Sequence, residues 1–477
     1  MLENKTENAK YGITGYVSLN KPSSDSVSKS TCLLEFLKKH DFFEGEEDLK
    51  KRERALGRLD HLLKKFVEEE GRRKGESGKS SGKIFTFGSY RLGVHDTGAD
   101  IDLLCVVPRF VSRKEFFDLF YEILKQEEQT GEITKAEDAY VPVIKMEYMG
   151  IPIDLTMARV NLPRVDSSIN LLNDKLLRNM DEKCILSLNG SRVTDAMLNL
   201  VPDCETFHMA LRTIKFWAKR RYIYGNAYGY FGGVAYAISV ARICQMYPNG
   251  SVYDVVCKYF ETFSSWDWPA PVILTPVVDH QYNLKVWDAK KYPADKYHKM
   301  PVITPAYPSM CATHNISQST ADLITHEIQR AKDIASEADG DMKKFITIFN
   351  STDFFRKYKL YVNVKIEADS ENMKAWIGYV ESKVRVLCNK LDTNSLIVAT
   401  IPFPKAFIGE TQCNFFAGIS VLRTSNASKR VYVDEQIRSF TDVINGWAGK
   451  SGDMKIEVRS ETKKGVQAFI KEYFDKK

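Results

Sequence analysis

At 477 residues, with 44% hydrophobic and 27% charged side chains, the chain has the composition of an ordinary globular protein and the length for several domains. No apolar run approaches the ~20 residues of a membrane span, and the polar N-terminus, Met1–Lys5, does not resemble a signal peptide. The nine cysteines are scattered without a C-x-x-C pair, which is typical of reduced thiols rather than of a zinc site. These features exclude the membrane-spanning and disulfide-rich secreted classes.

The net charge of +6 is unevenly placed along the chain. Residues 351–477 hold 21 Lys and Arg against 15 Asp and Glu, whereas the first 350 residues hold 47 of each. This surplus is compatible with a nucleic-acid-binding face in the C-terminal part, and equally with a solvated surface of basic bias.

The N-terminal 82 residues read as charged helices, of which residues 48–70 show the clearest apolar stripe. A short strand at residues 83–87 then ends at Gly88. Ser89 follows at a position where a tight turn or helix start exposes backbone N–H groups, and such groups attract phosphate. We therefore expect a phosphate-binding turn at Gly88 and Ser89.

Two aspartates precede the next apolar strand, residues 103–107. Because residues i and i+2 of a strand share a face, Asp100 and Asp102 are expected to point together while Ile101 points away. Adjacent carboxylates repel and raise each other's pKa unless a cation lies between them. A divalent ion such as Mg²⁺ accepts these oxygen ligands, so the pattern indicates nucleotidyl transfer.

A helix is expected around residues 113–127, followed by a hairpin over residues 141–156 with Met149-Gly150 at its turn. Asp154 alternates with the apolar residues of the second strand. A lone aspartate in this setting is usually a solvent-exposed residue. Downstream of the Asp100–Asp102 pair, however, it is a third carboxylate that completes a ligand set for two metal ions.

An amphipathic helix is predicted over residues 204–222, with Lys215 on its basic flank. Glycines then interrupt a tyrosine-rich stretch, residues 222–233, before another apolar helix begins near Val234. Such aromatic residues are usually core and such a lysine is usually solvated. Glycines beside them also allow a planar base to approach the backbone closely.

The last 120 residues or so alternate as strand, helix, two strands, helix and strand. Their order, β-α-β-β-α-β, is that of the ferredoxin-like unit used by RRM-type RNA binders. The aromatic signature of those binders is absent, so RNA contact here is expected to depend on charge and shape more than on base stacking.

Five blocks of this sequence resemble the eukaryotic nuclear-type poly(A) polymerases of the DNA polymerase β-like nucleotidyltransferase superfamily. The resemblance covers roughly residues 11–410. The blocks are Phe87–His95, Gly98–Asp102, Leu176–Lys183, Asn189–Asp195 and Thr304–Asn315. Together they are far more specific than the short Gly-Ser and Asp-x-Asp pattern alone.

This resemblance implies an α+β multidomain fold. It comprises a polymerase β-like nucleotidyltransferase domain at residues 1–203, a mostly helical central domain at 204–350 and a ferredoxin-like, RRM-like RNA-binding domain at 351–477.

The resemblance also implies the roles of individual residues. Asp100, Asp102 and Asp154 hold two Mg²⁺ ions, for which Mn²⁺ can substitute, and Asp154 assists deprotonation of the RNA 3′-hydroxyl. Lys145 touches the RNA 3′ end. The residues implied to bind ATP are Gly88, Ser89, Lys215 and Tyr224 at the phosphates, and Phe87, Asn226, Gly233 and Val234 around the adenine.

The implied activity is template-independent addition of AMP from ATP to RNA 3′ ends during mRNA polyadenylation. Its implied partners are RNA and the pre-mRNA cleavage and polyadenylation machinery, in the nucleus and with no membrane. Two alternatives stay open: a terminal uridylyl- or CCA-type transferase, and a non-catalytic RNA-binding or scaffold protein on the same fold. The intact carboxylate triad argues against the second, because a protein without catalysis is free to lose mutually repelling charges.

Overall fold

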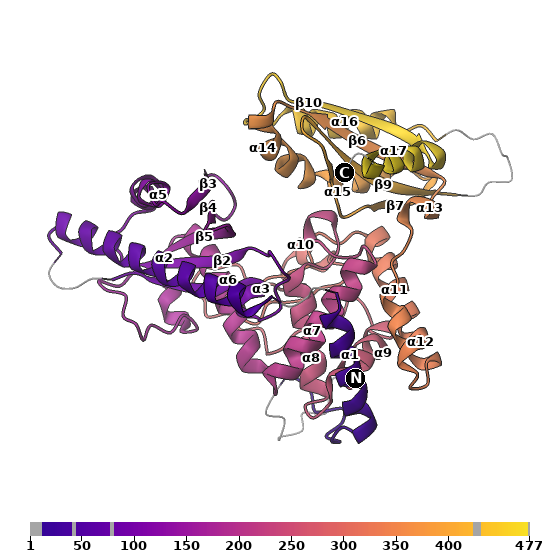
Figure 1. Ribbon diagram of the computed structural model, residues 1–477, viewed down its shortest axis with the longest axis horizontal. Helices are drawn as coiled ribbons and strands as arrows, with labels where there is room; N and C mark the ends of the chain where they lie inside the picture. The colour runs from indigo at the N-terminus through magenta and orange to yellow at the C-terminus, as the bar shows by residue number, and fades with distance from the viewer. Residues whose placement is uncertain (1–11, 41–43, 77–80, 423–430, 476–477) are drawn as a thin grey trace.

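The computed structural model describes residues 12–40, 44–76, 81–422 and 431–475, and the N-terminal stretch Met1–Lys5 lies outside them. A sheet-containing N-terminal region, a helical central region and a C-terminal region with its own sheet follow one another along the chain (Figure 1). The first helix, α1 (Ser24–Lys38), is an exception, since it packs with the central helices. Among the helices of the described chain, none combines the length and apolarity that a membrane crossing requires.

The N-terminal sheet has the strand order β1-β2-β5-β4-β3. Only β2 and β5 pair in parallel, and the other neighbours are antiparallel. The long amphipathic helix α2 packs against this sheet through Leu59, Leu63 and Phe66. The strands are β1 (Lys83–Phe87), β2 (Ile101–Val107), β3 (Thr130–Ala136), β4 (Val143–Tyr148) and β5 (Ile151–Arg159); the helices are α2 (Glu46–Arg73), α3 (Gly88–Arg91), α4 (Arg113–Glu115), α5 (Tyr121–Lys125) and α6 (Glu182–Leu200).

The predicted helix at residues 113–127 is present but not uniform. Ser112 and Glu115 form a capping box at its start, and a π-helical segment, Phe116–Phe120, separates α4 from α5. This segment buries Phe116, Phe117 and Phe120 in the N-terminal core. The predicted hairpin with its Met149-Gly150 turn is confirmed as β4 and β5.

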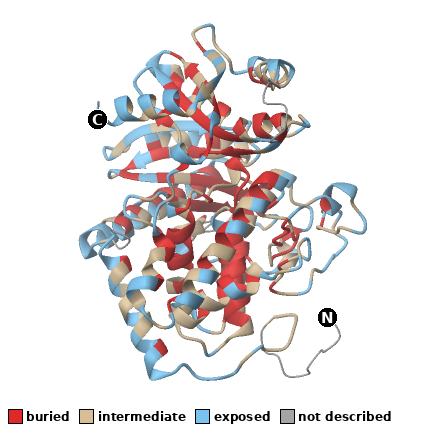
Figure 2. Ribbon diagram, turned by 90° about the vertical axis from the view of Figure 1, so that its right-hand side faces the viewer, coloured by how far each residue is buried: buried red, intermediate tan, exposed pale blue. Residues whose placement is uncertain are grey.

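Helix α6 joins the N-terminal and central cores. Its first half places Cys184, Ile185 and Leu188 in the core of the N-terminal sheet, while Val193 and Met197 lie in the core of the central helices. The central helices are α7 (Cys204–Arg220), α8 (Gly233–Met246), α9 (Val252–Ser264), α10 (Pro293–Lys296), α11 (Gln318–Glu337) and α12 (Met342–Phe345). Figure 2 shows buried residues concentrated in these helices and in the C-terminal sheet.

The C-terminal sheet has the order β10-β6-β9-β7 with antiparallel pairing throughout. Numbered within the β-α-β-β-α-β unit, this order is 4-1-3-2, which confirms the ferredoxin-like fold. The elements are α13 (Phe354–Lys357), β6 (Leu360–Glu367), α14 (Ser370–Glu381), α15 (Val384–Leu391), β7 (Ile397–Pro402), β8 (Phe407–Ile408), β9 (Gln412–Val421), α16 (Asp434–Asn445), β10 (Lys455–Thr462) and α17 (Lys463–Asp475).

The structure adds detail that the strand-and-helix prediction lacked. The helix expected from Trp376 to Leu391 is divided into α14 and α15, and a last helix, α17, follows the final strand. Phe469 and Tyr473 of α17 join Phe354 and Tyr358 in an aromatic cluster on one face of the sheet. The opposite face, with Val362 and Val364, packs against α14, α15 and α16, in a core that is continuous with that of the central helices.

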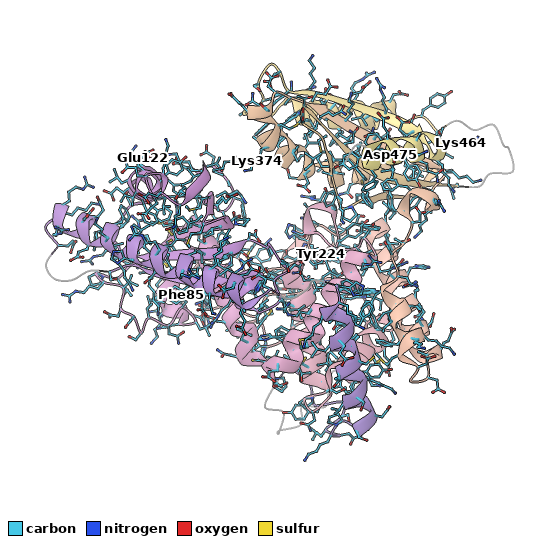
Figure 3. All side chains as sticks on the ribbon, viewed as in Figure 1. Phe85, Glu122, Tyr224, Lys374, Lys464 and Asp475 are labelled. Carbon is cyan, nitrogen blue, oxygen red and sulfur yellow. The ribbon has the colours of Figure 1, made fainter. Side chains whose placement is uncertain are left out.

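The C-terminal region is tied to both other regions. Tyr228 donates a hydrogen bond to Glu381 (2.7 Å), and Tyr230 donates one to the carbonyl of Pro402 (2.7 Å). On the other side, the ammonium of Lys374 on α14 lies 2.8 Å from the carboxylate of Glu132 on β3, and Figure 3 shows Lys374 reaching toward the N-terminal region. Both partners of this ion pair are largely exposed, so it contributes little stability.

The packing of α13 on the sheet generates a stability prediction at Gly418. A Cβ added there would lie 2.2 Å from the ring of Tyr358, a buried residue. We expect Gly418→Ala to lower the free energy of unfolding by about 1–3 kcal/mol, because the ring and strand must separate. Hydrogen exchange of the β9 amides and thermal unfolding measure this change.

The matched control is Gly378→Ala on α14, where an added Cβ meets no atom within 4 Å. We expect this variant to raise the free energy of unfolding by up to about 1 kcal/mol, since alanine has a higher helix propensity than glycine. Equal free energies of unfolding for the two variants would contradict the close packing of Tyr358 on β9.

Candidate active site

The register of the N-terminal sheet aligns four side chains in one row across four strands. Phe87 pairs with Asp102, Asp102 with Asp154, and Asp154 with Lys145. Asp100 immediately precedes β2, which begins at Ile101, two residues before the predicted apolar strand. The sheet therefore brings the three aspartates together although more than fifty residues separate Asp100 from Asp154.

Carboxylate oxygens of Asp100, Asp102 and Asp154 all lie within 4.8 Å of one another. Burial and then repulsion from Asp100 and Asp154 raise the pKa of Asp102 to about 7. Lys145 partly opposes this effect, since its ammonium lies 2.5 Å from Asp154. The three carboxylates offer only oxygen ligands, and Lys145 alone does not neutralise their negative charge. Both features fit the binding of a divalent cation.

A cavity of about 280 Å³ opens beside this cluster. It is bounded by the turn after β1, the start of β2, α6, α7 and the beginning of α8. Among the residues predicted to function, its lining includes Gly88, Ser89, Asp100, Asp102, Lys215, Tyr224, Gly233 and Val234.

Four predicted site residues do not line this cavity. Asp154 and Lys145 lie at the far side of the carboxylate row. Phe87 packs behind the site against Gly190 of α6, where an added Cβ would meet its ring at 2.6 Å. Asn226 lies behind Gly232, and its backbone carbonyl accepts a hydrogen bond from Asn315 (3.3 Å).

Gly88 is required by its position beside the carboxylates. Its φ is +63°, in the left-handed region, and a Cβ there would lie 2.1 Å from Oδ2 of Asp102. A side chain at this position would occupy the space of the carboxylate. The predicted turn takes the form of the short helix α3, Gly88–Arg91.

Lys215 and Lys219 of α7 converge on Asp96. The Nζ atom of Lys215 donates to Oδ1 of Asp96 (3.1 Å) and to the carbonyl of Val94 (2.9 Å), and Lys219 donates to Oδ2 of the same carboxylate. Burial lowers the pKa of Lys215, an effect that Asp96 opposes. Burial acts to raise the pKa of Asp96, but the two lysines hold it below its usual value. Asp96 thus orients Lys215 at the cavity and Lys219 next to it, over the ring of Tyr224.

Tyr224 forms the opposite wall of the cavity. Its ring stacks on Tyr236 with 5.8 Å between centroids, and an added Cβ on Gly233 would come within 3.0 Å of its hydroxyl. Burial, followed by the charges of Asp96 and Asp100, raises the pKa of Tyr224 to about 12, so it remains a neutral hydroxyl.

A buried ion pair supports the loop that leads into Asp100. The guanidinium of Arg52 donates to both carboxylate oxygens of Glu44 (2.8 and 2.6 Å) and to the carbonyl of Ala99 (2.7 Å). Glu44 also accepts from the backbone N–H of Gly98 (3.3 Å) and lies 3.3 Å from Nε2 of His95. Helix α2 and Glu44, just before it, are thereby tied to the backbone of Gly98 and Ala99 and to the side chain of His95.

Sequence reasoning missed several of these residues. Asp96 lies between the Phe87–His95 and Gly98–Asp102 blocks, and the i, i+4 spacing of Lys215 and Lys219 is the sequence signal for two lysines on one face of a helix. Glu44 and Arg52 carry no such signal, because their role depends on the tertiary position of α2. Cavity-lining residues that the prediction also left out are Leu92, Val94, Thr194, Met197, Leu211 and Tyr236.

Three family models match successive parts of the chain. They are described as Poly(A) polymerase nucleotidyltransferase domain at residues 12–201, Poly(A) polymerase central domain at 206–351, and Poly(A) polymerase predicted RNA binding domain at 353–414.

Curated relatives resemble the chain over most of its length. Poly(A) polymerase PAPalpha of Candida albicans is 44% identical over 403 residues, which are 83% of this chain and 72% of the relative. Poly(A) polymerase pla1 of Schizosaccharomyces pombe is 42% identical over 85% of this chain and 72% of its own length. Poly(A) polymerase of Dictyostelium discoideum is 38% identical over 97% of this chain and 59% of its own length.

Among solved structures the likeness is weaker. A structure of Cid1, described as having RNA terminal uridylyl transferase activity, is 14% identical, with a TM-score of 0.47 over 69% of this chain and 99% of that chain. The identity and coverage of the curated relatives, together with the three matching models, confirm the resemblance noted in the sequence. The chain therefore belongs to the poly(A) polymerase family.

Proposed function

We propose that this protein is a polynucleotide adenylyltransferase that adds AMP from ATP to RNA 3′ ends without a template. The observation that carries the proposal is the row of carboxylates in the sheet beside a cavity that also contains Lys215 and Tyr224. Family membership supports the same activity. In this reaction the RNA 3′-oxygen bonds to the α-phosphorus of ATP, and the bond to pyrophosphate breaks.

Asp100, Asp102 and Asp154 would hold two divalent cations, Mg²⁺ or Mn²⁺. Their oxygens converge within 4.8 Å, and the repulsion between them is the kind that bound cations relieve. When bound, such ions lower the pKa of the attacking hydroxyl and neutralise charge on the phosphates. We assign to Asp154 the further role of accepting the proton of the RNA 3′-hydroxyl.

The triphosphate would be bound by residues on the other side of the cavity. Lys215 is buried, lines the same cavity as Gly88 and Ser89, and donates a hydrogen bond to Asp96. Two ammonium groups held by one carboxylate leave net positive charge for an anionic ligand. Tyr224 would add a neutral hydroxyl donor to the same phosphates.

The adenine would contact Gly233 and Val234 at the start of α8. Phe87 and Asn226 belong to this proposal as residues that shape the pocket from behind its lining, through Gly190 and Gly232. The glycine at 233 lets the hydroxyl of Tyr224 approach the backbone, which sets the width of the pocket.

Lys145 would contact the RNA 3′ end, since its side chain is 54% exposed and next to Asp154. We further propose that the domains end near residues 203 and 350, as the sequence suggested. We also propose that the protein acts in the nucleus with the pre-mRNA cleavage and polyadenylation machinery.

The first test supplies an unstructured RNA primer, Mg²⁺ and each NTP separately. We expect elongation with ATP and little with UTP, CTP or GTP. Asp102→Asn should reduce the rate of elongation by more than about a hundredfold. Mutating even the residues that hydrogen-bond to a metal ligand typically lowers metal affinity or activity by about 10–100-fold, and Asp102 is a proposed ligand itself. Equal use of UTP or CTP would favour the uridylyl- or CCA-type alternative. RNA binding without any ATP turnover in Mg²⁺ or Mn²⁺ would favour a scaffold.

A second prediction uses the contact between Gly88 and Asp102. We expect Gly88→Ala to lower kcat by at least about tenfold, because a methyl group displaces a carboxylate that must be held in place. The control is Gly75→Ala, which has a similar φ of +71° but no atom within 4 Å of an added Cβ.

The two variants share a backbone cost of about 1–2 kcal/mol for a non-glycine residue in the left-handed region. Only at Gly88 does the added Cβ clash with another residue, Asp102. Equal kcat values, measured at saturating ATP and RNA, would show that the position of Asp102 does not limit the reaction.

A further inference from the structure

The segment of residues 285–299, called the basic segment here, crosses between the N-terminal and central regions. Val286 lies in the core of the N-terminal sheet, and Met300, just beyond the segment, lies in the core of the central helices. Helix α10 is part of the segment, and Figure 1 places it between the N-terminal sheet and the C-terminal region. Its cationic side chains are Lys285, Lys290, Lys291, Lys296 and Lys299, with His298 beside them.

Part of this charge is used within the segment. Lys285 pairs with the buried Asp295 (3.3 Å) and, like Lys291, lies over the ring of Tyr292, at 4.9 and 5.2 Å from its centroid. Asp295 also accepts from the backbone N–H of Asp288 (3.1 Å), which fixes the local fold.

The other lysines of the segment have no such partner. Lys290, Lys296 and Lys299 are exposed, and no carboxylate of the described chain lies within ion-pair distance of them. Positive charge that is not neutralised internally is available to an anionic partner.

Two of these lysines border a hollow of about 400 Å³ between the basic segment and α11. Tyr297 lines it and is 75% exposed, and Trp268 forms part of the opposite side. The hollow also contains the carboxylate of Asp322, which already accepts from the amide of Gln318 (2.8 Å). Exposed aromatic rings beside lysines are the usual means of binding single-stranded nucleic acid, by base stacking and phosphate contact.

The hollow adjoins a second one, which lies against helix α6 of the candidate active site. His298 also lines a second hollow of about 380 Å³, which Asn189 of α6 and Met310 border. Further along the same helix, Thr194 and Met197 line the cavity beside the carboxylates. Helix α6 thus borders both the second hollow and the cavity beside the aspartates, and the second hollow adjoins the one at Tyr297 through His298.

We propose that the basic segment and this hollow bind the RNA a few nucleotides upstream of its 3′ end, with a base on Tyr297 and phosphates on Lys296 and Lys299. This inference rests on the proposed extension of RNA. It places RNA on the central region, in addition to any contact with the C-terminal region. There, one face of the sheet is already covered by α17 and the other by α14, α15 and α16.

The test compares oligo(A) primers of 5 and 20 nucleotides in steady-state elongation. We expect the double variant Lys296→Ala/Lys299→Ala to raise KM for the 20-mer about tenfold and to leave KM for the 5-mer, KM for ATP and kcat unchanged. Its affinity for the 20-mer should depend less on salt, with the slope of log affinity against log salt smaller by about 1.4 for two lost phosphate contacts. Tyr297→Ala should weaken binding of the 20-mer by about tenfold, and Tyr297→Phe should restore it because the ring remains.

The matched control is Lys343→Ala/Lys344→Ala. It removes the same charge from exposed lysines on α12, which lies at the other end of the central region (Figure 1). A KM for the 20-mer and a salt slope equal to those of this control would overturn the proposal.

Fluorescence anisotropy with the labelled 20-mer keeps this test separate from catalysis. If the wild-type protein binds the 20-mer but extends no primer, the proposed function is wrong. The affinities of the variants for the 20-mer, compared with that of the wild type, still show whether RNA binds at this site. Unchanged affinity in both the lysine and tyrosine variants would reject the site even if the enzyme is active.

Discussion

The parallel pairing of β2 with β5 determines the chemistry that this protein can perform. It aligns Asp102 with Asp154, and Asp100 lies just before β2. The three carboxylates are therefore close together, and their negative charges repel one another. Such a cluster weakens the folded state unless cations neutralise it. In the described structure Lys145 compensates only part of this charge. The repulsion among these carboxylates is relieved when divalent ions bind between them. Holding them together without such ions requires contacts that fix the backbone around them.

Those contacts act by fixing the backbone before Asp100. Helix α2 holds the loop through Arg52 and Glu44, and α7 holds it through the lysines that share Asp96. Because the loop is restrained from both sides, the N-terminal sheet and the central helices cannot shift independently at this point. Lys215 also lines the cavity, so one carboxylate both connects the two regions and orients a charge that is offered to a triphosphate.

Much of this could be predicted from the sequence, and the limits are physical. Asp100, Asp102, Gly88 and Ser89 belong to one short stretch, so local periodicity and turn chemistry were sufficient to identify them. Asp154 needed only the assumption that its hairpin joins the same sheet. Residues such as Glu44 and Arg52 are determined by where α2 packs, which no local pattern reports. The family resemblance implied that Phe87 and Asn226 contact the adenine. In the structure neither residue lines the cavity, and they pack closely against Gly190 and Gly232.

The C-terminal region shows how a correct topology can still leave the binding surface undetermined. The order of strands was readable from alternation alone, but the final helix, α17, was not predicted, and it changes which face is accessible. Phe469 and Tyr473 pack on the sheet with Phe354 and Tyr358, so these aromatic rings stabilise the fold and are not available to bases. The absence of an RRM-type aromatic signature is consistent with this arrangement. Recognition by charge then depends on lysines that lack internal partners, and in the central region such lysines lie beside the exposed ring of Tyr297.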